Sequence, residues 1–351
     1  MRTIYNRPKH QRGVAVIMAL LLTTLAITIV ASLFWQQQVQ VRLIENQRLQ
    51  LQKQWILRGA LDWASLILRE DAKYSSVDSL DEPWAAPLAE TRLNQYVENG
   101  KADGDVADTT LSGSISDAQA RFNLNNLVRN GVIDPLSVNI FTKLLTSLNL
   151  NTRYASATAS LISMATPMNY TPPPLLATPN KGAQAIISTS LARTTANTTA
   201  TPALTTLPAR IPSTTDTHAS MPYTQLDDLL MVPGMTAKEV SILKPYVIFL
   251  PSRTPINANT ASAEVIAAVI PGLTLADAET LIASRKSAHF RDLADLSNRL
   301  RGKVFNAADL SVNTSYFLVN GKVHMNRARL DMQSLLERNG STTKTLWVRD
   351  F

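Results

Sequence analysis

Few residues in this chain of 351 residues could act as nucleophiles or bind a transition metal. The sequence has no cysteine, which excludes disulfide bonds, thiolate nucleophiles and cysteine-ligated zinc. No two histidines have the i, i+4 spacing of a helical zinc site; they are His10, His218, His289 and His324. We find no Ser-His-Asp spacing, phosphate-binding loop or nucleophile elbow. The sequence therefore predicts a protein that is not an enzyme and that has no cofactor.

Carboxylates offer one further candidate site, in the cluster Asp103, Asp105 and Asp108. Calcium loops of the EF-hand type need a D-x-[DN]-x-[DN]-G pattern with a distal glutamate, and this cluster lacks it. We interpret the cluster as a solvated turn and predict no metal site there.

The positive charge of the chain is concentrated at its N-terminus. The first 13 residues contain no acid, and their basic residues are Arg2, Arg7, Lys9 and Arg12. The net charge of the whole chain is +7, so the remaining 338 residues carry only +3. This distribution indicates a basic leader and not a surface for nucleic acid.

An uncharged stretch follows the leader, from Val14 to Val41. Its apolar part ends at Trp35 and spans 22 residues, roughly 33 Å as a helix, which is enough to cross a bilayer core. Positive charge upstream predicts a cytoplasmic N-terminus and a periplasmic main body. A cleaved signal peptide would need a shorter apolar region and a small-residue cleavage site. A plain signal anchor stays open, and we expect one helix over about 14–70.

The junction between leader and apolar helix is Arg12-Gly13-Val14. A basic leader that ends in glycine, followed at once by an apolar helix, resembles the substrates of prepilin peptidase. The resemblance implies cleavage between Gly13 and Val14 on the cytoplasmic side, with methylation of the new N-terminus at Val14.

The fifth residue after this cleavage point is Met18, where that class usually has glutamate. In most pilins and pseudopilins the carboxylate can neutralise the terminal amine of a neighbouring subunit, because an unpaired charge in the membrane is costly. A subunit without it cannot offer that pairing to a subunit ahead. The chain therefore resembles the GspK family (general secretion pathway protein K) of minor pseudopilins in type II secretion, which lacks this glutamate.

The family resemblance implies an α+β pilin-like domain with a large all-α insertion. The long N-terminal helix would pack on a small antiparallel sheet. The phrase ArgPheAsnLeuAsn at 121–125 resembles a recurrent family phrase at the entrance to the insertion. We expect these segments: leader 1–13, helix 14–70, first pilin-like part 71–125, helical insertion 126–305 with a mobile Thr/Pro/Ala-rich loop at 166–222, and C-terminal strands 306–351.

Relatives typically carry an acidic loop in the insertion, and calcium binding has been associated with the family. This chain has no acidic residue between Asp134 and Asp216, so we do not expect a calcium site of the family type.

Local patterns refine the expected elements. We expect one or two strands over 111–127, a helix over 128–150 and another over 158–164. A strand over 310–319 should end in a hairpin turn at Asn320-Gly321, with two more strands following. His324 should be an exposed or edge strand residue.

An internal repeat, 38 residues apart, joins 224–236 to 262–274. Each copy has a short apolar helix, a Pro-Gly hairpin and a threonine; we expect Thr236 with Glu239, and Thr274 with Asp277, to form capping boxes. The phrase at 256–264 is shared with helix-hairpin-helix proteins that bind DNA, so a membrane-anchored DNA receptor is the main alternative. A second glycine is missing from both hairpins, and nine basic against eight acidic residues over 221–303 favour a protein-contact scaffold.

The function implied by the resemblance is mechanical. The chain would form the tip of the periplasmic pseudopilus and help initiate its assembly for export of folded proteins. Its expected partners are other minor pseudopilins, the prepilin peptidase and the inner-membrane secretion platform, and contact with secreted substrates is left open. A tip subunit of a related type IV pilus is a second alternative.

Overall fold

The computed structural model describes residues 12–92, 109–165, 223–300, 302–325 and 328–351. Its contacts divide the chain into two compact units. One comprises Met1–Phe122 with Thr254–Phe351, and the other comprises Asn123–Arg253. The leader before Arg12, the acidic cluster at 103–108 and the Thr/Pro/Ala-rich segment lie outside the described residues, as do His10 and His218.

The first unit begins with a single long helix, α1 (Arg12–Tyr74). The expectation of one continuous helix from the apolar stretch into the amphipathic one is confirmed. The segment has no proline, and Gly59, the one glycine beyond its first turn, has open space around it. Four residues at helical spacing are buried and define the face that packs on the sheet; they are Leu57, Leu61, Ala64 and Leu68.

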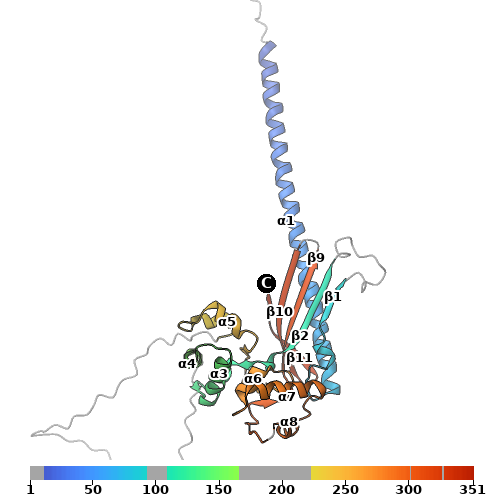
Figure 1. Cartoon of the computed structure of the whole chain (residues 1–351). Coiled ribbons are helices and arrows are strands. Elements are labelled where there is room, and N and C mark those ends of the chain that lie inside the picture. The colour runs from blue at the N-terminus through green and yellow to red at the C-terminus, as the bar shows by residue number, and fades with distance from the viewer. Residues whose placement is uncertain (1–11, 93–108, 166–222, 301, 326–327) are drawn as a thin grey trace, which may run out of the picture. The chain divides into compact units, whose positions relative to one another are not determined.

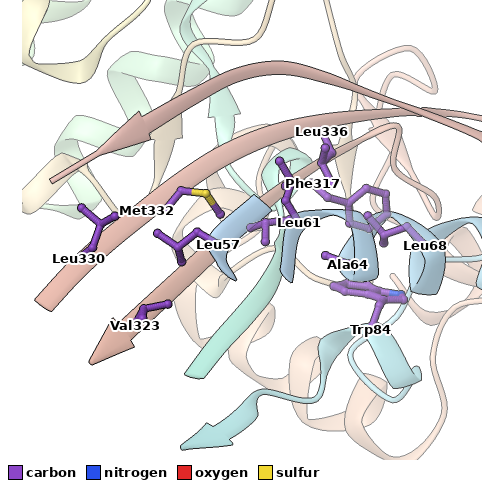
Figure 2. Packing of buried hydrophobic residues seen from close by; sticks show 11 residues of the cluster. Leu57, Leu61, Ala64, Leu68, Trp84, Phe317, Val323, Leu330, Met332 and Leu336 are labelled. Atoms are coloured by element: carbon purple, nitrogen blue, oxygen red, sulfur yellow. The ribbon is translucent and has the colours of Figure 1, made fainter. Parts of the chain in front are cut away.

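A five-stranded antiparallel sheet in the order β1-β2-β9-β10-β11 forms the rest of the pilin-like core. Its strands are β1 (Leu88–Arg92), β2 (Thr110–Asp117), β9 (Tyr316–Met325), β10 (Ala328–Asn339) and β11 (Thr342–Asp350). The C-terminal half of α1 lies against β9 and β10 (Figure 1). Figure 2 shows its leucines among apolar side chains of these strands. Trp84 packs edge-on to Phe317, with the ring centres 5.2 Å apart. The predicted α+β class is confirmed.

One turn prediction is wrong. Asn320 and Gly321 lie inside β9, where Gly321 pairs with Met332 on one side and Gly113 on the other. Glycine permits a close approach here, because a Cβ on Gly321 would lie 3.0 Å from Leu57 Cδ2, closer than most Cβ contacts. The Asn320-Gly321 pair therefore reflects the packing of Leu57 on β9 and does not mark a turn.

Short elements complete the first unit. They are η1 (Pro83–Ala85), η3 (Ala118–Ala120), β7 (Ile256–Asn257), α6 (Ala263–Val269), α7 (Leu275–Ser287), α8 (Leu293–Arg299) and β8 (Leu310–Ser311), and β3 (Phe122–Asn123) lies at its boundary. Strands β7 and β8 pair in parallel. The capping box of Thr274 with Asp277 at the start of α7 is confirmed.

The second unit contains η4 (Leu124–Leu127), β4 (Val128–Arg129), β5 (Val132–Ile133), α3 (Pro135–Ser147), α4 (Arg153–Ala165), η5 (Leu226–Met231), α5 (Ala237–Leu243) and β6 (Val247–Ile248). The expected helix over 128–150 is wrong in its first part. Asn130 and Gly131 have positive φ and close a β4–β5 hairpin, and α3 starts only after the Asp134 cap. The capping box of Thr236 with Glu239 is confirmed.

The compact units differ from the expected insertion over 126–305 at its C-terminal side. Residues after Arg253, including α6, α7 and α8, belong by their contacts to the first unit. The expected domain bounds and the 38-residue repeat stay predictions.

Candidate functional site on the N-terminal helix

The three residues that the sequence assigns to processing and tip placement lie in the first two turns of α1. Gly13 has open space around it, and Val14 is exposed. Met18 is one turn further along and is 60% exposed. The structure thus places all three on an accessible helix, while cleavage, methylation and the role of Met18 stay predictions.

The apolar stretch of α1 has no charged side chain, and the hydroxyls of its threonines are all hydrogen-bonded. Within the described residues, one helix is long and apolar enough to cross a membrane, Gly13–Tyr74, and it lies near the N-terminus. The hydroxyls of Thr23, Thr24 and Thr28 donate to backbone carbonyls one turn earlier, at 2.5–3.1 Å. This internal pairing removes the cost of a bare hydroxyl in hydrocarbon.

Beyond the apolar stretch, α1 has an exposed apolar face opposite its buried leucines. Trp55 is 69% exposed, and Leu51, Trp63 and Leu66 lie on the same side of the helix and are also exposed. A groove of about 380 Å³ runs alongside, between α1 and the β1–β2 side of the sheet. Large exposed apolar patches on soluble domains mark contact surfaces.

Arg338 of β10 joins the C-terminal end of α1 to the sheet. Its guanidinium donates to Asp71 at 2.9 Å and to Asp78, and it also donates to the carbonyl of Thr314 at 3.2 Å. The same group lies over the Phe317 ring, 4.6 Å from its centre. A bidentate cation on two carboxylates fixes the helix end more precisely than apolar contact alone.

The carboxylates around Arg338 are close enough to resemble a cation site. Oxygens of Asp71, Asp78 and Glu82 lie within 4.8 Å of one another. Arg338 already supplies the positive charge, and Glu82 accepts from the Ser79 amide at 2.9 Å and the Trp84 indole at 2.7 Å. Burial raises the pKa of Asp78 although Arg338 and the Thr314 amide act to lower it. We therefore interpret the cluster as a structural joint.

The segment 256–264, which resembles a segment of DNA-binding helix-hairpin-helix proteins, is hydrogen-bonded within the first unit. Asn257 donates to Asp117 at 2.8 Å, and Asn259 donates to the carbonyl of Phe290 at 2.9 Å. Arg285 is buried and donates to the carbonyls of Ala258 and Ala261. These groups serve as internal ties, and their bonding accounts for Asn257 and Asn259 of this segment without a phosphate ligand.

The remaining histidines of the described chain lie on the surface. His324 is an exposed residue of the central strand β9, and His289 is exposed just before Phe290. The expectation of an exposed strand position for His324 is confirmed.

Sequence reasoning did not find the Arg338 joint. Arg338 and Asp78 are 260 residues apart, and neither belongs to a motif. The available signal was an arginine near the end of a strand that mixes apolar and polar residues, which is too weak to name its partner.

The fold and the anchor define the class of protein. A long helix with an uncharged N-terminal stretch, packed by its C-terminal half on an antiparallel sheet, is a pilin-like α+β protein. A chain of the GspK-GspI-GspJ complex from enterotoxigenic Escherichia coli has the same fold, with a TM-score of 0.59 and 20% identity over 88% of this chain and 98% of that chain.

Sequence comparisons find similarity to one family. The family model "Type II secretion system (T2SS), protein K" matches residues 256–315. Type II secretion system protein K of Pseudomonas aeruginosa is 26% identical over 97% of this chain and 93% of that protein. Its counterpart from Klebsiella pneumoniae is 28% identical over 95% and 94%, respectively. The family-model match, the two relatives and the shared fold together support an assignment to the type II secretion system protein K family, the GspK minor pseudopilins. Its apolar helix is consistent with a single-pass anchor in the inner membrane.

Proposed function

We propose that this chain is the tip subunit of the periplasmic pseudopilus and helps initiate its assembly. The observation that carries the proposal is Met18, an exposed apolar side chain in a stretch of α1 that has no carboxylate. A following subunit can pair its own glutamate with the Val14 amine of this chain. This chain has no acid to offer a subunit ahead of it, so it is suited to the leading position.

The proposal includes the processing route. Prepilin peptidase would cut after Gly13 on the cytoplasmic face, and Val14 would become the methylated N-terminus. The main body would then lie in the periplasm, in keeping with the basic leader. The role is structural, with no reaction catalysed and no cofactor required.

We propose that the partners are other minor pseudopilins, equivalents of the GspI and GspJ in the complex to which this fold is similar. The exposed apolar face of α1 supports this, because it continues the helix that leaves the membrane and would be covered by a helix of the same origin. The inner-membrane platform and the peptidase would be transient partners.

A photo-cross-linker tests the assignment in living cells. Placed at Trp55 on the exposed apolar face, it should capture another minor pseudopilin. Placed at Lys344, an exposed residue of β11, it should give much less of that product. Equal capture at both positions, or capture of DNA at either, would contradict the proposed partners and favour the alternatives.

A further inference from the structure

Asp117, at the end of β2, is a buried carboxylate held by neutral donors. It is 3% exposed, and no basic side chain of the described residues forms an ion pair with it. It accepts from the amide of Gln119 at 2.7 Å, from Asn257 Nδ2 at 2.8 Å and from Thr260 Oγ1 at 2.5 Å. Burying a carboxylate without a cation disfavours its charged form.

These bonds join two segments that are adjacent to the second unit in sequence. Residues 117–119 precede its first residue, Asn123, and residues 254–260 follow its last residue, Arg253. Gln119 adds a bond of its own to the carbonyl of Pro255 at 3.0 Å. Asp117 is therefore the centre of a tie, by which we mean these hydrogen bonds within the first unit. They join the segment that precedes the second unit in sequence to the segment that follows it.

The charged groups around this tie are few. Arg121, on the same segment, favours the ionised form of Asp117 electrostatically. Asn257 bridges to the backbone carbonyl of Asp78, whose carboxylate is neutralised by Arg338. Thr260 and Thr314 contribute neutral donors to Asp117, and the buried Arg285 donates to the carbonyls of Ala258 and Ala261 on either side of Thr260 without pairing with Asp117. Burial dominates and raises the pKa of Asp117 from 3.8 to about 6, against the lowering effect of Thr260 and its other donors.

We propose that Asp117 is a proton-dependent latch that ties residues 117–119 to residues 254–260, tightest when its carboxyl is neutral. The Thr260 hydroxyl can reverse its bond when the carboxyl gains a proton, because a hydroxyl both donates and accepts. The amide of Gln119 keeps donating to Oδ1, and Asn257 keeps donating to Oδ2, which it shares with Thr260. Because protonation removes the cost of burying the charge while these bonds persist, mild acidification strengthens the tie, and neutral pH weakens it.

The direction follows from proton uptake. The folded protein takes up a proton as the pH falls through about 6, whereas the unfolded chain does so only near 3.8. Between about pH 7.5 and about pH 5, the equilibrium constant for opening the latch should therefore fall by about tenfold. This effect is independent of the proposed place in a pseudopilus.

Hydrogen exchange on the full chain in detergent measures the latch. After correction for intrinsic exchange rates, amides of 115–121 and 255–261 should gain up to about tenfold protection on going from about pH 7.5 to about pH 5. Asp117→Asn should abolish this gain. Asp62→Asn, at an exposed position of α1, should retain it. A gain that persists in Asp117→Asn, or protection that falls in the unaltered protein on acidification, overturns the proposal.

A second measurement does not depend on any variant folding. The carboxyl carbon of Asp117 in the unaltered protein should titrate with a midpoint near 6 by nuclear magnetic resonance. A midpoint at or below about 4, the ordinary value, would overturn the latch. Thr260→Val should move the midpoint upward, and Thr260→Ser should restore it.

Discussion

Gly113 of β2 and Gly321 of β9 face each other across the sheet directly beneath α1. A Cβ on Gly321 would lie 3.0 Å from Leu57 Cδ2, and one on Gly113 would lie 2.9 Å from the carbonyl oxygen of Asn320. At Gly321 the missing side chain lets Leu57 of α1 pack closely on β9, and at Gly113 it lets β2 approach the backbone of β9. The two glycines therefore permit two different close contacts, one between helix and sheet and one within the sheet.

Gly113→Ala should destabilise the pilin-like core. The clash is with a backbone oxygen, which cannot rotate away as a side chain could, so the strands must shift. We expect the free energy of unfolding of the full chain in detergent to fall by about 1–3 kcal/mol. Gly59→Ala, on the open side of α1, is the control and should not lower it. An unchanged free energy of unfolding in Gly113→Ala would show that the sheet does not depend on this close approach of β2 to β9.

Arg338→Met should lower the free energy of unfolding more than Arg329→Met, a similar change at an exposed ion pair of β10. It leaves Asp71 and Asp78 buried without their cation, which we expect to cost about 3–5 kcal/mol in chemical unfolding. Arg329→Met removes a similar pair with Asp331 on the exposed part of β10 and should change stability little. Equal effects of the two changes would mean that the joint at the end of α1 is not a structural requirement.

Gly13→Ala should block removal of the leader and, with it, secretion. The change is sterically harmless to the helix because nothing lies within 4 Å of the added carbon, so lost processing would report on recognition by the peptidase. The apparent size of the chain in a strain without prepilin peptidase provides the reference on a gel. A Gly13→Ala chain of mature size would contradict the assigned cleavage point.

Met18→Glu should weaken placement at the tip. The new carboxylate would lie in the membrane without an amine ahead of it to pair with. An unpaired charge there costs roughly several kcal/mol. Met18→Leu keeps the apolar character and should leave secretion and pseudopilus assembly intact. If Met18→Glu assembles and secretes normally, the tip position is determined by the periplasmic part of the chain and not by the anchor.

The sequence allowed the long helix and both threonine capping boxes to be predicted, because each depends on residues within a few turns of one another. The α+β class was predicted from the family resemblance. Asn-Gly pairs show where this fails. Asn130-Gly131 closes the β4–β5 hairpin, whereas Asn320-Gly321 continues β9 because Leu57 packs on it. The same dipeptide gives a turn or a strand according to contacts made far along the chain.

The joints of the first unit could not be predicted for the same reason. Arg338 pairs with Asp78, and Asp117 accepts from Asn257 140 residues away. Nothing in their local sequence selects these partners, since each is chosen by the packing of the sheet against α1 and against residues 254–260.

Gold labelling of assembled pseudopili tests the central claim most directly. The C-terminal residue Phe351 is exposed at the end of β11 and can carry a tag without disturbing the core. The account predicts label at one end of each pseudopilus and nowhere else. Label at intervals along the length would contradict it.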